Sequence, residues 1–229
     1  MSGHGAERDG AGGRRLYQAG LDLRGRACLV VGGGAVARRK AEGLAEAGAK
    51  VRVVAPECLP MPEGASVALR PFDDRDLEGV TLAVAASDDR ELNARVARLA
   101  RERGVWVNVV DEPGDGDVEL PAVVRRGALR IAVSTGGASP ALARRIRERL
   151  DEEYGPEWGQ LAELLGALRA EWEPRAIAAG VPPAARRAAW HELLDLPLAE
   201  LLAAGRTGEA EAQAGAVLER VLAEAGRKD

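Results

Sequence analysis

Aromatic residues are scarce in this chain: only 3% of its 229 residues are Phe, Trp or Tyr, although 46% are hydrophobic. The core must therefore be aliphatic, and the length allows one large domain or two smaller ones. No apolar run approaches the ~20 residues that cross a bilayer, and the N-terminus lacks the apolar segment of a signal peptide. Two cysteines are too few for a disulfide framework or a metal set. These absences predict a cytoplasmic protein that does not enter membranes.

The chain also lacks a strong net charge and has few histidines. Its formal charge is −4, so nucleic acid is not an expected partner. His4 falls in residues 1–15, which are rich in Gly and Arg without periodicity and are predicted to be a disordered tail. His191 falls in a helical region, where a lone histidine is more often a surface or packing residue than a ligand. Acid–base chemistry is therefore expected from carboxylates, hydroxyls and amides.

The chain does contain a strand–turn–helix–strand unit between residues 27 and 56. The apolar run Cys28–Val31 predicts a buried strand, and Gly32–Gly34 predicts a turn. Small and apolar residues then recur at helical spacing up to Gly48, and Val51–Val54 predicts a second strand. This order is typical of a dinucleotide-binding βαβ unit.

Within this unit, Gly32-x-Gly34-x-x-Ala37 is the small-residue variant of the dinucleotide fingerprint. The first glycine permits the turn, and the second lets backbone amides approach a pyrophosphate that the helix N-terminus attracts. The alternative is a glycine turn that only joins a strand to a helix. Glu57 is the one acid near the end of the second strand, so this site leaves the choice between NAD and NADP open.

Strand and helix patterns continue to alternate up to residue 112. We predict strands at 67–69, 82–85 and 105–110 and a helix at 91–103, which indicates an α/β fold with a Rossmann-like, doubly wound parallel sheet. Ligands bind such sheets at the carboxyl ends of the strands. The residues predicted there as cofactor-binding are Gly32, Gly34, Ala35, Val36, Pro56, Glu57, Ser87, Asp88 and Asn108, with Asp111 beside them. The Asn108 side chain could instead satisfy backbone groups.

The pattern changes after residue 112. Strands are predicted at 122–124 and 129–134, and they could form a small α+β region or extend the first sheet. Thr135–Pro140 is a second glycine loop that leads into a helix, with Ser139 as its N-cap and Pro140 as its first residue. The predicted domains are a tail (1–15), an NAD-binding domain (16–112), a middle region (113–150) and a helical C-terminal domain (151–229).

The middle region is strongly basic. Residues 125–149 contain seven arginines and only one acid, Glu148. The arginines are Arg125, Arg126, Arg130, Arg144, Arg145, Arg147 and Arg149. Arginine clamps carboxylates through paired hydrogen bonds, so this segment suits an anionic ligand. Each arginine could equally lie on a solvated helix face or in a dimer interface.

Four motifs in order resemble one known family. They are Leu23-x-Gly25-x-x-CysLeuValVal-Gly32-Gly-Gly34-x-Val36-Ala37-x-Arg39-Lys40, Ala85-Ala86-x-Asp88-Asp89-x-x-Leu92-Asn93, Val107-Asn108-Val109-Val110-Asp111 and Ser134-Thr135-Gly136-Gly137-Ala138-Ser139-Pro140. From about Leu16 onward the chain resembles precorrin-2 dehydrogenases, the dehydrogenase part of siroheme synthases, some of which are also sirohydrochlorin ferrochelatases.

The resemblance implies that NAD oxidises precorrin-2 to sirohydrochlorin, that Asp111 carries the chemistry, and that a homodimer forms through residues 113–150. The substrate is a tetrapyrrole with acetate and propionate arms, and the pathway is siroheme or corrinoid biosynthesis. Its predicted ligands are Arg125, Arg126, Thr135, Gly136, Ser139, Arg144 and Arg145. The resemblance leaves metal insertion open as a second activity. The absence of a His/Cys cluster with ligand spacing argues against it, and no metal-binding residue is predicted. The rival function is a non-enzymatic NAD-sensing regulatory domain.

Overall fold

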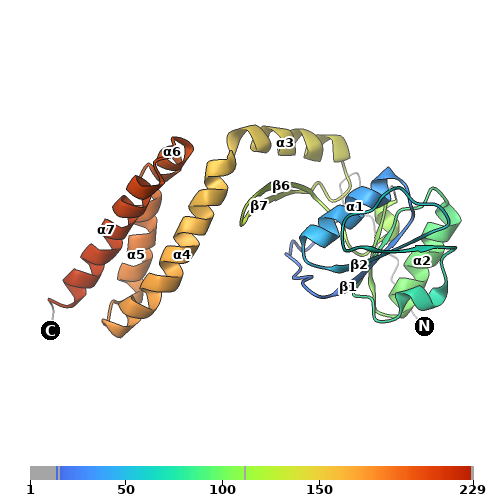
Figure 1. Cartoon of the computed structure of the whole chain (residues 1–229), viewed down its shortest axis with the longest axis horizontal. Coiled ribbons are helices and arrows are strands. Elements are labelled where there is room, and N and C mark those ends of the chain that lie inside the picture. The colour runs from blue at the N-terminus through green and yellow to red at the C-terminus, as the bar shows by residue number, and fades with distance from the viewer. Residues whose placement is uncertain (1–13, 15, 111, 228–229) are drawn as a thin grey trace. The chain divides into compact units, whose positions relative to one another are not determined.

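The computed structural model describes residue 14, residues 16–110 and residues 112–227, and it divides into two compact units (Figure 1). The first unit holds the described residues up to Leu120 together with Thr135–Ser139. The second holds Pro121–Ser134 and the described residues from Pro140 onward. Asp111 and most of the predicted tail lie outside the described residues.

A five-stranded parallel sheet forms the centre of the first unit, which confirms the predicted α/β fold class. Its order is β3-β2-β1-β4-β5, with bounds β1 Ala27–Val31, β2 Lys50–Ala55, β3 Ser66–Leu69, β4 Leu82–Ala85 and β5 Trp106–Val109. Two α-helices, α1 (Ala35–Glu46) and α2 (Arg90–Glu102), connect strands, and short 3₁₀ turns lie at η1 (Asp74–Leu77) and η2 (Pro113–Asp115).

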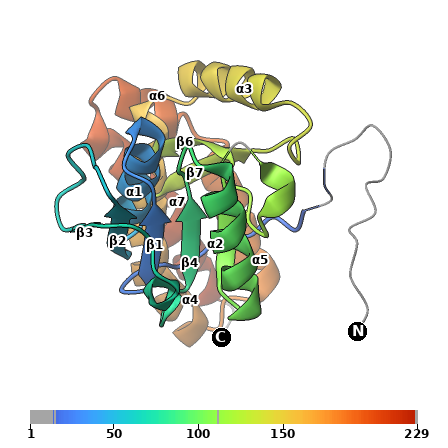
Figure 2. The same cartoon turned by 90° about the vertical axis from the view of Figure 1, so that its right-hand side faces the viewer.

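The two faces of the sheet are covered by different helices because strand side chains alternate. Val30 and Val53 pack with Ala41 of α1, whereas Val31 and Val54 pack with residues of α2. Figure 2 shows α1 and α2 on opposite sides of the central strands. Strand β1 pairs with β2 on one side and with β4 on the other, and the connecting helices cross to the opposite face of the sheet at this point. A ligand crevice is expected at the carboxyl ends of these strands.

The second unit joins a β-ribbon to a set of helices. Strands β6 (Ala122–Arg126) and β7 (Leu129–Val133) pair only with each other, so they do not extend the first sheet. The helices are α3 (Pro140–Glu153), α4 (Pro156–Ala178), α5 (Pro183–Leu194), α6 (Leu198–Ala203) and α7 (Thr207–Ala225). Gly and Pro residues lie at most of the breaks between these helices, and α3 begins at Pro140 as predicted.

Large side chains fill the helical core. Trp172 is only 2% exposed, and its indole N–H donates to the carbonyl of Leu218 over 2.9 Å, which joins α4 to α7. Trp190 of α5 meets the Trp172 ring edge-on, with ring centroids 5.8 Å apart. Figure 1 shows α4, α5 and α7 alongside one another. None of the described helices is long and apolar enough to span a membrane.

Candidate functional site

The glycine turn after β1 is packed so closely that its first two residues have no room for a side chain. Gly32 has φ +129°, and a Cβ there would overlap the carbonyl oxygen of Ala86 at the end of β4. A Cβ on Gly33 would overlap the carbonyl oxygen of Glu57. Gly34 has open space at its Cβ position, and no side chain caps the α1 N-terminus. The turn therefore presents backbone N–H groups as a phosphate site requires.

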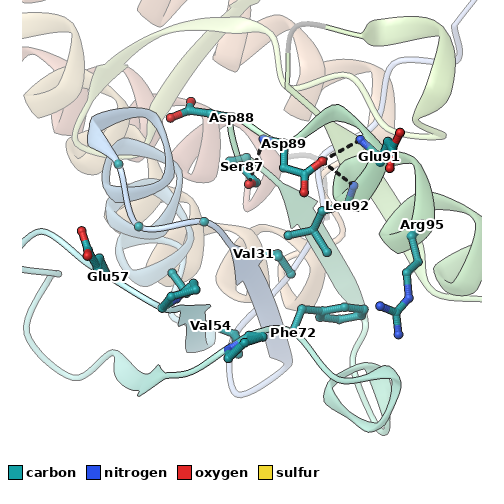
Figure 3. Close-up of a pocket in the computed structure, with 17 residues that line it drawn as sticks. Val31, Val54, Glu57, Phe72, Ser87, Asp88, Asp89, Glu91, Leu92 and Arg95 are labelled. Carbon is teal, nitrogen blue, oxygen red and sulfur yellow. Dashed lines mark hydrogen bonds between the residues drawn. The ribbon is translucent and has the colours of Figure 1, made fainter.

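A cleft of about 900 Å³ lies in front of this turn (Figure 3). Its wall comes from the carboxyl ends of β1, β2 and β4, the segment after β3 and the first turns of α2. Six of the nine predicted cofactor-binding residues line it: Gly32, Gly34, Pro56, Glu57, Ser87 and Asp88. Ala35 and Val36 lie on the first turn of α1 outside this wall.

Hydrogen bonds fix the backbone where β4 leads into α2. Asp89 caps the helix: its Oδ1 accepts from the N–H groups of Glu91 and Leu92 at 2.9 and 3.1 Å. The buried Asn93 amide closes a ring with Ser87, accepting from its N–H at 3.1 Å and donating to its carbonyl at 2.7 Å. Asp89 therefore caps α2, and the Asn93 amide holds the backbone of Ser87 at the cleft.

Phe72 and Arg95 are among the lining residues that the sequence analysis did not name. Phe72 follows β3 and is 8% exposed, and the guanidinium carbon of Arg95 lies 5.7 Å from its ring centroid. Arg95 also donates to Asp74 Oδ1 at 2.5 Å. Figure 3 shows the Arg95 guanidinium beside the Phe72 ring at the end of the cleft away from the glycine turn.

The residues of the cleft fit a dinucleotide. The volume is in the usual range of cofactor pockets. The pyrophosphate would meet the open Gly34 position and the positive end of the α1 dipole. The floor is apolar, with Val31 and Val54 at its centre, and suits the faces of bases. The site can therefore hold and orient an NAD-type coenzyme.

Two further candidates remain, Asn108 and Asp111. Asn108 is buried on β5, and its Nδ2 donates to the carbonyl of Val118 over 2.8 Å. Among the described residues its Oδ1 has no hydrogen-bond partner. Asn108 thus ties the segment after β5 back to the sheet and does not line the cleft. Asp111, the predicted catalytic residue, lies outside the described residues.

The second glycine loop packs with the first unit although its flanks belong to the second. The Thr135 hydroxyl accepts from the Ser139 N–H at 3.0 Å, and Gly136 and Gly137 have positive φ values. Arg14 joins two loops: its backbone N–H donates to the Gly136 carbonyl at 2.8 Å, and its guanidinium donates to the Gly116 carbonyl at 2.9 Å. Arg14 therefore departs from the prediction that residues 1–15 are disordered.

No group of three or more His, Cys, Asp or Glu side chains in the described part of the chain could hold a metal ion. Both cysteines are unpaired thiols, and burial raises the pKa of Cys28 and of Cys58. A raised pKa keeps a thiol protonated, which makes it a poor metal ligand or nucleophile. The described lining of the cleft offers backbone amides, the Ser87 hydroxyl and carboxylates.

Comparison with protein families gives three matches in order along the chain. Residues 19–122 match an NAD(P)-binding family, residues 126–153 match the central part of a sirohaem biosynthesis protein, and residues 157–222 match the sirohaem synthase dimerisation region. The first match covers the β1–β5 sheet and the cleft.

Similar proteins agree with these matches. The chain is 46% identical over 196 residues to the siroheme synthase of Stutzerimonas stutzeri and 44% identical over 198 residues to that of Pseudomonas fluorescens. Each match covers 83% of this chain but 41% of the relative. A solved structure titled "SirC, precorrin-2 dehydrogenase" matches with a TM-score of 0.63 at 29% identity, over 90% of this chain and 98% of that one.

The chain belongs to the family of sirohaem biosynthesis proteins that share these three regions.

The family region named for dimerisation does not match the part of the chain where the sequence analysis expected dimer contacts. We expected dimer contacts in residues 113–150, but the region described for dimerisation matches 157–222, helices α4 to α7. The middle segment instead matches the central region of the siroheme proteins.

The predicted substrate arginines of this family member lie in the second unit and differ in what they contact. Arg126 donates from Nε to the Tyr154 carbonyl at 2.8 Å and from Nη2 to the Asp151 carbonyl and Oδ1 at 2.9 Å, so it caps the end of α3. Arg125 is exposed on the β-ribbon opposite Arg130. Arg144 and Arg145 are exposed on the first turns of α3.

Proposed function

We propose that this chain oxidises precorrin-2 to sirohydrochlorin with NAD as the hydride acceptor, in siroheme or corrinoid biosynthesis. The observation that carries the proposal is the likeness to the solved precorrin-2 dehydrogenase over 98% of that protein, combined with a glycine turn and cleft that fit the coenzyme. The relatives named siroheme synthase are longer than this chain, so only this oxidation and the optional metal step are proposed for it.

The coenzyme side of the proposal rests on the first unit. Gly32 and Gly34 let the backbone approach the pyrophosphate, and the α1 N-terminus stabilises its charge. Glu57, which follows β2, is suited to accept a hydrogen bond from a ribose hydroxyl. Ser87 and Asp88, which follow β4, also line the cleft. When bound, NAD supplies the hydride-accepting ring. Holding that ring against the substrate is the protein's contribution.

The proton that leaves the substrate needs a base, and Asp111 is the candidate. It directly follows the β5 region, where a carboxylate beside a coenzyme can have its pKa raised into a useful range. This role remains a prediction from the sequence.

For substrate binding we propose the exposed arginines Arg125, Arg144 and Arg145, with Thr135, Gly136 and Ser139 of the second glycine loop. Arginine pairs with carboxylates through two parallel hydrogen bonds, which suits a tetrapyrrole with acetate and propionate arms. Because Arg126 already donates to the end of α3, its contribution would be to hold the ribbon and helix in place.

We also propose that the protein acts as a cytoplasmic homodimer. The support is the match of residues 157–222 to the sirohaem synthase dimerisation region, and the open edges of the isolated β6–β7 ribbon could add contacts. Sedimentation of the full chain across a concentration series tests the dimer.

Metal insertion into sirohydrochlorin is the second candidate activity, supported by the siroheme synthase relatives. It requires a base to take the pyrrole protons, and Asp111 would serve again. Purified protein with sirohydrochlorin and Fe²⁺ or Co²⁺, without NAD, should exceed the spontaneous rate if this activity is present. An unchanged rate would restrict the chain to the dehydrogenase step.

The dehydrogenase is tested by NADH formation from enzymatically generated precorrin-2. Wild type should turn over, and Asp111→Asn should lower kcat by about a hundredfold or more while leaving the Kd for NADH unchanged, because a lost general base affects chemistry more than binding. Asp115→Asn, at an exposed position of η2, is the matched control and should behave as wild type. Full activity of Asp111→Asn would remove Asp111 from the mechanism.

A further inference from the structure

The cleft is not symmetric about its glycine turn. Beyond β1 it reaches across the end of β2 to Pro71 and Phe72, which follow the edge strand β3. None of its described lining residues comes from β5. In dinucleotide-binding sheets the acid after the second strand contacts the adenosine ribose. The described cleft therefore includes the adenosine half of the coenzyme site.

The far wall of this half has the chemistry of a base-stacking surface. Phe72 supplies a buried ring, and the Arg95 guanidinium lies over it with its carbon 5.7 Å from the centroid. Leu92 adds an apolar side chain from the same face of α2. Guanidinium planes and aromatic rings are the groups on which nucleobases stack.

The guanidinium is fixed in orientation from outside the cleft. Arg95 donates to Asp74 Oδ1 at 2.5 Å, and Asp74 is the first residue of η1. That turn is itself held by a capping box between Asp73 and Asp76, and Arg70 makes a bidentate pair with the buried Asp76 at 2.6 and 2.8 Å. A pre-oriented side chain loses little entropy on binding, so its contact with a ligand is worth more.

We propose that Arg95, held between Phe72 and Asp74, is the adenine-stacking residue of the cleft, and that its pairing with Asp74 makes the site select NAD over NADP. This rests on the proposed coenzyme binding and adds the residues that recognise the base and discriminate the 2′-phosphate.

The discrimination follows from the charges on the wall. Arg95 is the one cation among the described lining residues, and Asp74 already neutralises it. The acids Glu57, Asp88, Asp89 and Glu91 also line the cleft. A 2′-phosphate would enter beside Glu57 without an unpaired cation to receive it, whereas a 2′-hydroxyl can donate to that carboxylate.

The test measures equilibrium binding of NADH, NADPH, 5′-AMP and nicotinamide mononucleotide to the full chain. Arg95→Ala should weaken 5′-AMP and NADH about tenfold and leave nicotinamide mononucleotide unchanged. Arg95→Lys, which keeps the charge without the plane, should recover only part of the loss. Arg98→Ala is the matched control, because Arg98 lies on the same helix and pairs with Glu102; it should bind as wild type.

Asp74→Asn tests the selectivity separately. It should lower the ratio of the NADPH to the NADH dissociation constant about fivefold, since Arg95 becomes available to the 2′-phosphate, and Arg95→Ala in the same background should abolish that change. If Asp74→Asn left the ratio of the two dissociation constants unchanged, or if Arg95→Ala bound 5′-AMP normally while the wild type binds NADH, the inference would be overturned but the proposed function would stand. Failure of the wild type to bind any of the four ligands would overturn the proposed function as well.

Discussion

The glycine turn of the first unit and the helical core of the second unit are packed through different parts of the chain. In the first unit backbone meets backbone, since Gly32 and Gly33 lie directly against the carbonyls of Ala86 and Glu57. In the second unit large side chains fill the space, as Trp172 does between α4 and α7. A backbone contact that tolerates no Cβ keeps N–H groups available to a ligand, whereas side-chain packing adds stability and offers no site. The contrast predicts that substitutions in the glycine turn change coenzyme binding and that substitutions in the helical core change mainly stability.

Trp172→Ala should have the largest effect on stability. Removing a buried indole leaves a cavity and removes the hydrogen bond from Trp172 to the Leu218 carbonyl, at a cost of about 3–5 kcal/mol. Chemical denaturation checks the loss, and NADH titration below the transition should give the wild-type Kd. A parallel fall in NADH affinity would break the comparison, because it would show that the helical core supports the coenzyme cleft.

Gly32→Ala should have the largest effect on binding, lowering NADH affinity by about a hundredfold (roughly 2.7 kcal/mol) because the added Cβ displaces the turn from Ala86 and strains its positive φ. Gly166→Ala is the matched control in the second unit, where an exposed glycine of α4 has open space at its Cβ position. It should stabilise the protein by up to about 1 kcal/mol. Normal NADH binding by Gly32→Ala would contradict the phosphate site.

Asp76→Asn sharpens the comparison from within the first unit. Asp76 is buried, and its pKa lies below the usual range of a carboxyl group. The main cause is the pair of hydrogen bonds from the Arg70 guanidinium, and the hydrogen bond from the Asp73 backbone N–H lowers the pKa further. Because the folded pKa is the lower one, the stability this group contributes is present above the unfolded pKa of about 4 and is lost as the pH falls through the folded value.

The variant should therefore be less stable than wild type by about 2 kcal/mol near neutral pH, and the difference should shrink below about pH 4. Thermal melts at a series of pH values measure it. Asp115→Asn, at an exposed site, should leave the pH profile unchanged. A difference between wild type and Asp76→Asn that grows on acidification would contradict the assignment.

Arg126→Met should have the smallest of these effects on stability, about 1 kcal/mol, because it uncaps the end of α3 while keeping an apolar stem. Its comparison is Arg145→Met on the exposed face of α3. We expect Arg145→Met to melt like wild type but to raise the KM for precorrin-2. If Arg126→Met instead raised the KM for precorrin-2 and Arg145→Met instead lowered the stability, Arg126 would be the substrate ligand.

The glycine turn, the parallel sheet and the helix breaks could be predicted because each depends on a local rule. Gly32 and Gly34 are spaced for a βαβ turn, and the valine runs read as buried strands. Asp89 as a helix cap is equally local.

The rest of the cleft depends on where distant segments meet. Arg95 looks like Arg98 in the sequence, and only the packing of α2 beside η1 brings one of them to Phe72. Phe72 carried a signal that was overlooked, since it is the only phenylalanine in an aliphatic chain. Arg126 was predicted to bind substrate because it lies in a segment dense in arginine. The sequence does not distinguish a guanidinium that caps a helix end from one that faces a ligand.

The central claim is that the glycine-turn cleft delivers NAD to a tetrapyrrole for hydride transfer, and the most direct test is the stoichiometry of a single anaerobic reaction. Wild type supplied with precorrin-2 and NAD, at an NAD concentration below the wild-type Kd, should form NADH and sirohydrochlorin in equal amounts, and Gly32→Ala should form both about a hundredfold more slowly. Sirohydrochlorin appearing without NADH, or equal rates from both proteins, would contradict the account.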